Sequence, residues 1–196
     1  MASPVGDLLA DLDRGLQLLG VGWYLFGARA AMFYGVARLT ADVDVTVHLS
    51  GSVTTATLAE TLERHEFMLR ESDPAFVATT RVLPLVHRPS GLPLDIVLAG
   101  PGLEVAFLER ARPHTIEGVS VPVASAEDIV VMKALAGRPK DLEDVVAIAA
   151  AQGAALDERA VRERLIAIEE ALGQSDLIPA LDAALKQAQR TRPRGA

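Results

Sequence analysis

The chain has 196 residues with 26 acidic and 19 basic side chains, which gives a formal net charge of −7. Half of the residues are hydrophobic and 23% are charged, a globular composition that excludes a mainly disordered chain. The acidic excess disfavours a protein that wraps nucleic acid through a broad basic face, although it allows one that meets only a nucleic acid end, and the absence of cysteine excludes disulfides, iron–sulfur clusters and thiol nucleophiles.

Two features of the sequence predict a cytoplasmic protein without a membrane segment. Residues 1–13 include acidic side chains but no basic stretch of the kind that opens a secretory signal peptide. The longest uncharged stretch, residues 45–59, contains Thr, Ser and His and is too short to span a bilayer. We therefore expect neither a signal peptide nor a transmembrane helix.

Helix and strand signals alternate through the first part of the chain. Leucines recur at helical spacing after Pro4, and Gly20 ends that pattern. The aromatic residues Trp23, Tyr24 and the pair 33–34 are expected in the core. The periodicities predict helices over 4–19, 28–36, 55–65 and 104–109, strands over 23–26, 42–49, 67–70, 82–87 and 93–98, and a hairpin with strands over 115–116 and 119–123.

Helix signals predominate after Val123. Ser125 followed by Glu127 and Asp128 is an N-cap pattern, and it opens a helix that Gly137 closes. Further helices are predicted over 141–151, 157–172 and 175–189, before a loose tail with arginines at 190, 192 and 194. We therefore predict an α+β protein with a small mixed β-sheet flanked by helices in domain 1–124, followed by a C-terminal helical region in 125–196.

An acidic pair stands in the predicted strand 42–49. Residues i and i+2 of a strand point the same way, about 6.5–7 Å apart, so Asp42 and Asp44 place two carboxylates on one face. Such carboxylates repel each other unless a hard cation such as Mg²⁺ neutralises them. The spacing alone is weak support, because an isolated pair can simply face solvent. Asp11 and Asp13 repeat the spacing in a helical pattern, where the two side chains diverge.

The surroundings strengthen the interpretation of this pair. Gly27 stands at a strand-to-helix corner, where the missing Cβ lets backbone N–H groups approach a phosphate. A third acid, Asp95, lies in the apolar strand 93–98 and points away from the face formed by its leucine and isoleucine neighbours. A carboxylate on such a strand is costly unless it faces solvent or a partner.

The order of these residues resembles the DNA polymerase β-like nucleotidyltransferase superfamily. The resemblance rests on Gly27, a short helix, an Arg-x-Thr-x-Asp-x-Asp run that ends at Asp44, and a later strand that carries Asp95. The later Lys-x-x-Ala-Gly-Arg-x-Lys-Asp-x-x-Asp run, residues 133–144, looks like the AbiEii-like branch, which includes nucleotidyltransferase toxins of bacterial toxin–antitoxin pairs. Together the motifs span residues 20–150.

The resemblance implies a metal site and a catalytic carboxylate. Asp42 and Asp44 are expected to bind Mg²⁺ or Mn²⁺. Asp95 is expected to complete the metal site and to serve as, or to orient, the base for the acceptor hydroxyl.

The resemblance also implies a set of nucleotide-binding residues. Gly27 and Ala28 are expected to line the triphosphate of an NTP, although Ala28 replaces the family's Gly or Ser and therefore lacks a hydroxyl contact. Lys133 matches the lysine that contacts phosphate, and Asp141 matches its acidic partner. Arg38 is expected at the same site. The bland alternatives are an exposed helical Lys133 that contributes little to folding, a charged helix–helix turn over residues 138–141, and a structural pairing of Arg38 with Asp42 or Asp141.

The implied activity is Mg-dependent transfer of a nucleoside monophosphate (NMP) from an NTP to an acceptor, with release of pyrophosphate. An RNA acceptor, with a tRNA end as one candidate, fits the toxin-like branch, and a protein side chain or a small molecule is the alternative acceptor. A toxin of this kind has a cognate antitoxin protein as its partner. The competing hypothesis is a non-catalytic nucleotide-sensing or antitoxin-like binding module with the same fold.

Overall fold

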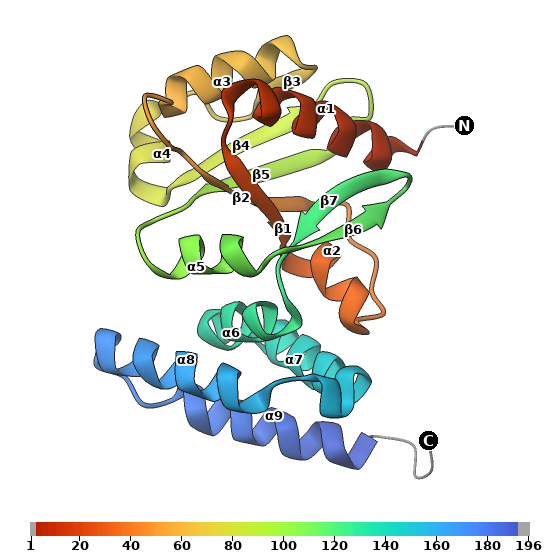
Figure 1. Ribbon diagram of the computed structural model, residues 1–196, viewed down its shortest axis with the longest axis vertical. Coiled ribbons are helices and arrows are strands. Elements are labelled where there is room, and N and C mark those ends of the chain that lie inside the picture. The colour runs from red at the N-terminus through yellow and green to blue at the C-terminus, as the bar shows by residue number, and fades with distance from the viewer. Residues whose placement is uncertain (1–2, 192–196) are drawn as a thin grey trace. The chain divides into compact units, whose positions relative to one another are not determined.

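The computed structural model describes residues 3–191, and over that range the chain is an α+β protein (Figure 1). The described residues form a mixed sheet of seven strands and nine α-helices. The predicted fold class is therefore confirmed.

The strands are short and lie mainly in the first two thirds of the chain. They are β1 (Gly22–Phe26), β2 (Val43–His48), β3 (Phe67–Leu69), β4 (Val82–His87), β5 (Pro93–Leu98), β6 (Arg112–Ile116) and β7 (Val119–Val123). Their order across the sheet is β3-β4-β5-β2-β1-β7-β6. The pairs β2–β5 and β1–β7 are parallel, and all the other neighbours are antiparallel.

The helices are distributed along the whole described chain. They are α1 (Pro4–Leu19), α2 (Gly27–Ala31), α3 (Thr55–Arg64), α4 (Pro74–Thr80), α5 (Leu103–Arg110), α6 (Ala126–Ala136), α7 (Pro139–Gln152), α8 (Glu158–Leu172) and α9 (Leu177–Thr191). Short 3₁₀ turns cover Met32–Tyr34 and Gly153–Ala155. None of the helices within residues 3–191 combines the length and the apolar character that a membrane crossing needs.

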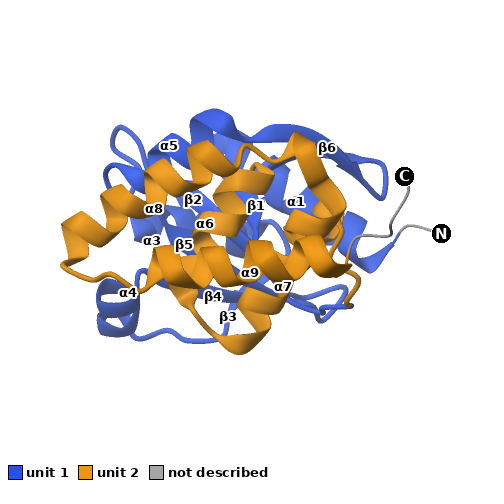
Figure 2. Cartoon of the chain, turned by 90° about the horizontal axis from the view of Figure 1, so that it is seen from below, with its two compact units in different colours: residues 1–29, 39–124 blue, residues 30–38, 125–196 orange. Residues whose placement is uncertain are grey.

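The described residues divide into two compact units (Figure 2). Unit 1 holds the sheet and comprises residues 3–29 and 39–124. Unit 2 comprises residues 30–38 and the helices of 125–191. The assignment of 1–124 and 125–196 as domains stays a prediction.

Hydrophobic burial on one face of the sheet organises unit 1. Helix α1 begins with Pro4 in its first turn and ends where Gly20 adopts a left-handed conformation. Its inward leucines are fully buried, and α1 lies beside α3 on this face (Figure 1). The alternating valines of β2 and the leucines of β4 and β5 supply the other half of this core. The fully buried members of these elements are Leu8, Leu9, Leu12, Leu16, Val43, Val45, Val47, Leu85 and Leu94.

Ser125 and Gly137 bound the first helix of unit 2 as the sequence predicts. The Ser125 hydroxyl accepts a hydrogen bond from the Asp128 backbone N–H at 3.2 Å, and Gly137 ends α6 in a left-handed conformation. Pro139 then begins α7 after a single intervening residue. Because this connection is so short, the end of α6 and the first turns of α7 must lie next to each other.

Most predicted elements are present, but one helix was missed and two predictions were wrong. Helix α4 was not predicted, although Asp73 caps it and Pro74 occupies its first turn. The predicted helix over 28–36 ends at Ala31 and continues as a 3₁₀ turn. It stops because Gly35 has a φ of 108° and packs so closely on Ala151 that a Cβ would lie 2.2 Å from the Ala151 Cβ. As a result Phe33, which was predicted in the core, is 38% exposed.

Candidate active site

Two of the three predicted carboxylates are direct neighbours across the sheet. Asp44 on β2 and Asp95 on β5 are register partners in a parallel pair. Partners in register point to the same face, and both aspartates alternate with buried residues of the opposite face. Both side chains are partly exposed. The fold therefore brings together two carboxylates that lie far apart in the sequence.

Gly27 lies against the Asp44 carboxylate. Phe26, the residue before it, is the register partner of Asp44 in the antiparallel β1–β2 pair. Gly27 has a φ of 72°, and a Cβ built on it would lie 2.2 Å from the Asp44 Oδ2. Both the backbone conformation and the close approach therefore require glycine. Ala28 follows in the first turn of α2 and is partly buried.

Arg29 supplies positive charge beside the carboxylates of unit 1. Its guanidinium donates a 2.7 Å hydrogen bond to the Thr40 carbonyl, and its Nε is buried without a hydrogen-bond partner. Burial lowers the pKa of Arg29, while the nearby charges of Asp44 and Asp42 partly offset that effect. The side chain is half-buried and ties α2 to the segment before β2.

Asp42 lies just outside the sheet. Strand β2 begins at Val43, and the Asp42 backbone N–H donates to the Thr40 hydroxyl at 3.2 Å. Asp42 is exposed, whereas Asp44 is partly buried within the strand. The two carboxylates therefore belong to the same segment but differ in exposure.

Asp95 is paired with Arg70, which was not among the predicted site residues. The Arg70 guanidinium donates to the Asp95 Oδ1 and, through Nε, to the Leu85 carbonyl at 2.9 Å. The Arg70 backbone N–H donates to the Pro84 carbonyl, and Pro84 is the register partner of Asp95. Arg70 thus extends from the end of β3 across β4 to reach β5.

The carboxylates of unit 1 fit a divalent cation in their chemistry. Magnesium prefers carboxylate oxygens and keeps positions for phosphate oxygens, and Asp44 and Asp95 offer such ligands from adjacent strands. The close contact between Gly27 and the Asp44 carboxylate further fixes one of these ligands. Within residues 3–191, however, no three His, Asp or Glu side chains are gathered as one set of metal ligands.

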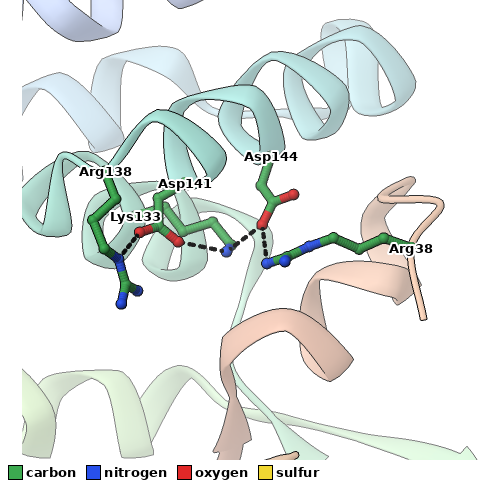
Figure 3. A network of polar contacts seen from close by, with 5 residues as sticks. All are labelled: Arg38, Lys133, Arg138, Asp141 and Asp144. Atoms are coloured by element: carbon green, nitrogen blue, oxygen red, sulfur yellow. Dashed lines mark hydrogen bonds and ion pairs between the residues drawn. The ribbon is translucent and has the colours of Figure 1, made fainter. Parts of the chain in front are cut away.

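The other predicted site residues form a polar cluster inside unit 2 (Figure 3). The Lys133 Nζ of α6 lies 2.6 Å from the Asp144 Oδ2 and 3.3 Å from the Asp141 Oδ1, both of α7. Arg38 pairs with the Asp144 Oδ2 at 2.8 Å, and Arg138 pairs with Asp141. The short α6–α7 connection brings Lys133 next to Asp141 and Asp144, whereas Arg38 reaches Asp144 from a distant segment of unit 2.

Lys133 is not the exposed lysine that one of the alternatives predicted. It is 5% exposed, and Asp141 and Asp144 are similarly buried. Removing one partner from a buried ion pair leaves an uncompensated charge, which is strongly destabilising. We therefore expect Lys133 to contribute to the stability of unit 2.

The charges around Asp141 keep it ionised. Burial raises the pKa of Asp141, but the hydrogen bond from Arg138 and the charge of Lys133 outweigh burial and lower the pKa below its usual value. The suggested pairing of Arg38 with Asp42 or Asp141 was wrong, because Arg38 pairs with Asp144. Asp144 was not selected from the sequence, although it lies three residues after Asp141 on the same helix face.

Three solved structures share the fold of this chain at low sequence identity. The solution structure of the antibiotic-resistance factor ANT(2″)-Ia aligns over 88% of this chain and 99% of that chain, with 17% identity and a TM-score of 0.55. Its crystal structure in complex with adenylyl-2″-tobramycin aligns over 81% and 97%, with 17% identity and a TM-score of 0.54. An antigenic nucleotidyltransferase-like protein from Paracoccidioides brasiliensis aligns over 93% and 91%, with 20% identity and a TM-score of 0.53.

Sequence comparison assigns the family directly. No curated protein matches the sequence significantly. The profile of the nucleotidyl transferase AbiEii toxin family, described as belonging to a type IV toxin–antitoxin system, matches residues 11–194. This match covers most of the chain and confirms the resemblance that the motifs suggested. The chain is therefore a nucleotidyltransferase that belongs to the AbiEii toxin family.

Proposed function

We propose that this nucleotidyltransferase moves an NMP from a Mg²⁺-bound NTP to a hydroxyl of an RNA acceptor, with a tRNA end as the leading candidate. The observation that carries the proposal is the in-register pair Asp44 and Asp95, with Gly27 packed against Asp44. Carboxylates placed in this way suit the binding of a divalent cation together with a triphosphate.

The carboxylates of unit 1 have separate roles in this proposal. Asp42 and Asp44 would hold the cation, with Asp95 as a further ligand. When bound, the cation supplies positive charge at the triphosphate and at the developing charge of the transition state. Asp95 would also accept or direct the proton of the acceptor hydroxyl, whose oxygen forms a bond to the α-phosphorus as the bond to pyrophosphate breaks.

Gly27 and Ala28 would line the triphosphate. Gly27 adopts a conformation in which no side chain separates the backbone from the Asp44 carboxylate. Ala28 offers its backbone N–H but no hydroxyl. Any contact of this corner with phosphate therefore comes from the backbone.

The buried cluster of unit 2 would bind the nucleotide phosphates. Its side chains, Lys133, Arg38, Arg138, Asp141 and Asp144, carry three positive and two negative charges, which leaves one positive charge in excess. The Arg38 Nε is buried without a hydrogen-bond partner, and the Arg138 side chain is 62% exposed. An excess cation with an unused donor suits an anionic ligand.

The wider biological proposal follows the family. We place the protein in the cytoplasm as the toxin of a toxin–antitoxin pair, with an antitoxin as the cognate partner. Arg138, Lys140 and Arg190 are exposed cations of unit 2 that suit contact with RNA phosphates. The tail arginines Arg192 and Arg194 lie outside the described residues.

Labelled-nucleotide transfer tests the acceptor and the metal together. The wild type and an Asp42→Ala variant are incubated with total cellular RNA, Mg²⁺ and each α-labelled NTP in turn, with and without a chelator. We expect label in a discrete RNA band, dependent on Asp42 and on the metal. RNA binding should weaken with added salt by about one unit of log–log slope per phosphate contact. Label on the protein or on a small molecule would contradict the RNA acceptor, and label in the presence of chelator would contradict the metal requirement.

A further inference from the structure

The Arg70 guanidinium occupies the Asp95 Oδ1, an oxygen that would be needed as a metal ligand. Arg70 lies at the end of β3, the three-residue strand at one side of the sheet, and its guanidinium bonds both the Leu85 carbonyl and the Asp95 Oδ1. A backbone hydrogen bond to Pro84 fixes the start of the side chain. Two donors and a fixed backbone hold the guanidinium over Asp95.

Arg70 is one of two arginines that flank the carboxylates. Arg29 follows the corner at Gly27, which packs against the Asp44 carboxylate, and its guanidinium donates to the Thr40 carbonyl two residues before Asp42. Arg70 is paired with Asp95. Three carboxylates with two guanidinium groups carry a net charge of −1, whereas the carboxylates alone would carry −3. The arginines therefore remove most of the field that would attract a divalent cation.

The contact between Arg70 and Asp95 is weak enough to be displaced. Both side chains are well exposed, at 40% and 37% respectively. Exposed ion pairs contribute little, so a ligand with more favourable contacts can separate the two groups. A bare cation brings no acceptor for the released guanidinium. A cation with a triphosphate brings phosphate oxygens, which suit both the cation and arginine.

We propose that Arg70 holds Asp95 in the nucleotide-free enzyme, so that the divalent cation binds well only together with the NTP. This inference rests on the proposed function, because it takes Asp95 as a metal ligand. Arg70 thereby sets the order in which the reactants assemble.

Binding of Mn²⁺ without nucleotide tests the inference. Free Mn²⁺ is measured by electron paramagnetic resonance against the wild type, Arg70→Gln and Arg64→Gln. Arg64 is a matched control, since it is exposed, belongs to the same unit and pairs only at 3.7 Å with Glu60. We expect Arg70→Gln to bind Mn²⁺ about fivefold more tightly than the wild type, because a competing cation has been removed. Arg64→Gln should bind as the wild type does.

A second variant guards against loss of fold. Arg70→Lys keeps the charge but cannot hold the Leu85 carbonyl and the Asp95 carboxylate at once, and circular dichroism shows which variants fold. A gain in Mn²⁺ affinity in either folded variant, abolished by adding Asp95→Asn, supports the inference. Wild-type affinity in the folded variants overturns it. Failure of the proposed function would look different, since the wild type would then bind no Mn²⁺–NTP and transfer no label.

Discussion

Gly27 and Asp44 are in such close contact that no side chain fits between them: a Cβ on Gly27 would lie 2.2 Å from the Asp44 Oδ2. The contact arises because Asp44 pairs with Phe26 across β1 and β2, and the chain turns into α2 at the next residue. Asp44, which was predicted as a metal ligand, is thus in direct contact with Gly27, which was predicted to line the triphosphate.

Gly27→Ala should lower both stability and activity. The alanine must adopt a left-handed conformation, which costs about 1–2 kcal/mol, and it must also push the Asp44 carboxylate aside. Overpacking of this kind adds about 1–3 kcal/mol. Urea unfolding and the label-transfer assay measure the two effects.

Gly20→Ala provides the matched control. Gly20 has a φ of 62°, close to the 72° of Gly27, but nothing lies within 4 Å of a Cβ built on it. It should lose only the conformational part of the stability and keep full activity. Equal losses of stability in the two variants would show that the contact with Asp44 carries no energetic weight.

Lys133→Ala should destabilise the protein severely. Asp141 and Asp144 would remain buried with one positive partner fewer, and breaking a buried pair costs about 3–5 kcal/mol. For a chain of this size that loss corresponds to a fall in Tm of about 10 °C. Lys140→Ala, at an exposed position of α7, is the control and should unfold as the wild type does. A wild-type Tm in Lys133→Ala would mean that the buried cluster does not stabilise unit 2.

Asp141 should make stability sensitive to acid. Its pKa is lower in the folded protein than the unperturbed value of 3.8, so the unfolded state takes up its proton first as the pH falls. The stabilisation is present above pH 3.8 and is lost as the pH falls through the folded pKa. Wild-type stability should therefore fall toward that of Asp141→Asn, by up to about 1.4 kcal/mol per pH unit. A constant difference between the two proteins from pH 6 to pH 2.5, measured by denaturant unfolding, would contradict this.

Local patterns in the sequence predicted the part of the site that depends on neighbouring residues. Alternation placed Asp44 opposite the buried valines of β2 and placed Asp95 opposite Leu94, and the structure has both arrangements. The motif around Lys133 and Asp141 predicted a pair, and these two residues do lie together. These features could be predicted because strand alternation decides on which face Asp44 and Asp95 lie, and the short α6–α7 connection decides that Lys133 and Asp141 are close.

The rest depends on contacts between distant segments. Arg70 meets Asp95 only because β3, β4 and β5 pair in one particular register, which no local pattern encodes. Arg38 meets Asp144 across 106 positions of the sequence. Their charges are visible in the sequence, but their partners follow from the fold.

The most direct test of the account is release of pyrophosphate and transfer of α-label by Asp44→Asn, beside Asp13→Asn. Both variants neutralise the second acid of an Asp-x-Asp pair, but Asp13 lies in α1, whereas Asp44 lies on the sheet beside Gly27 and Asp95. The account predicts that Asp13→Asn reacts at the wild-type rate. It predicts that Asp44→Asn remains folded and loses activity by at least about 100-fold. Wild-type turnover by folded Asp44→Asn would contradict the assignment of this carboxylate to the active site.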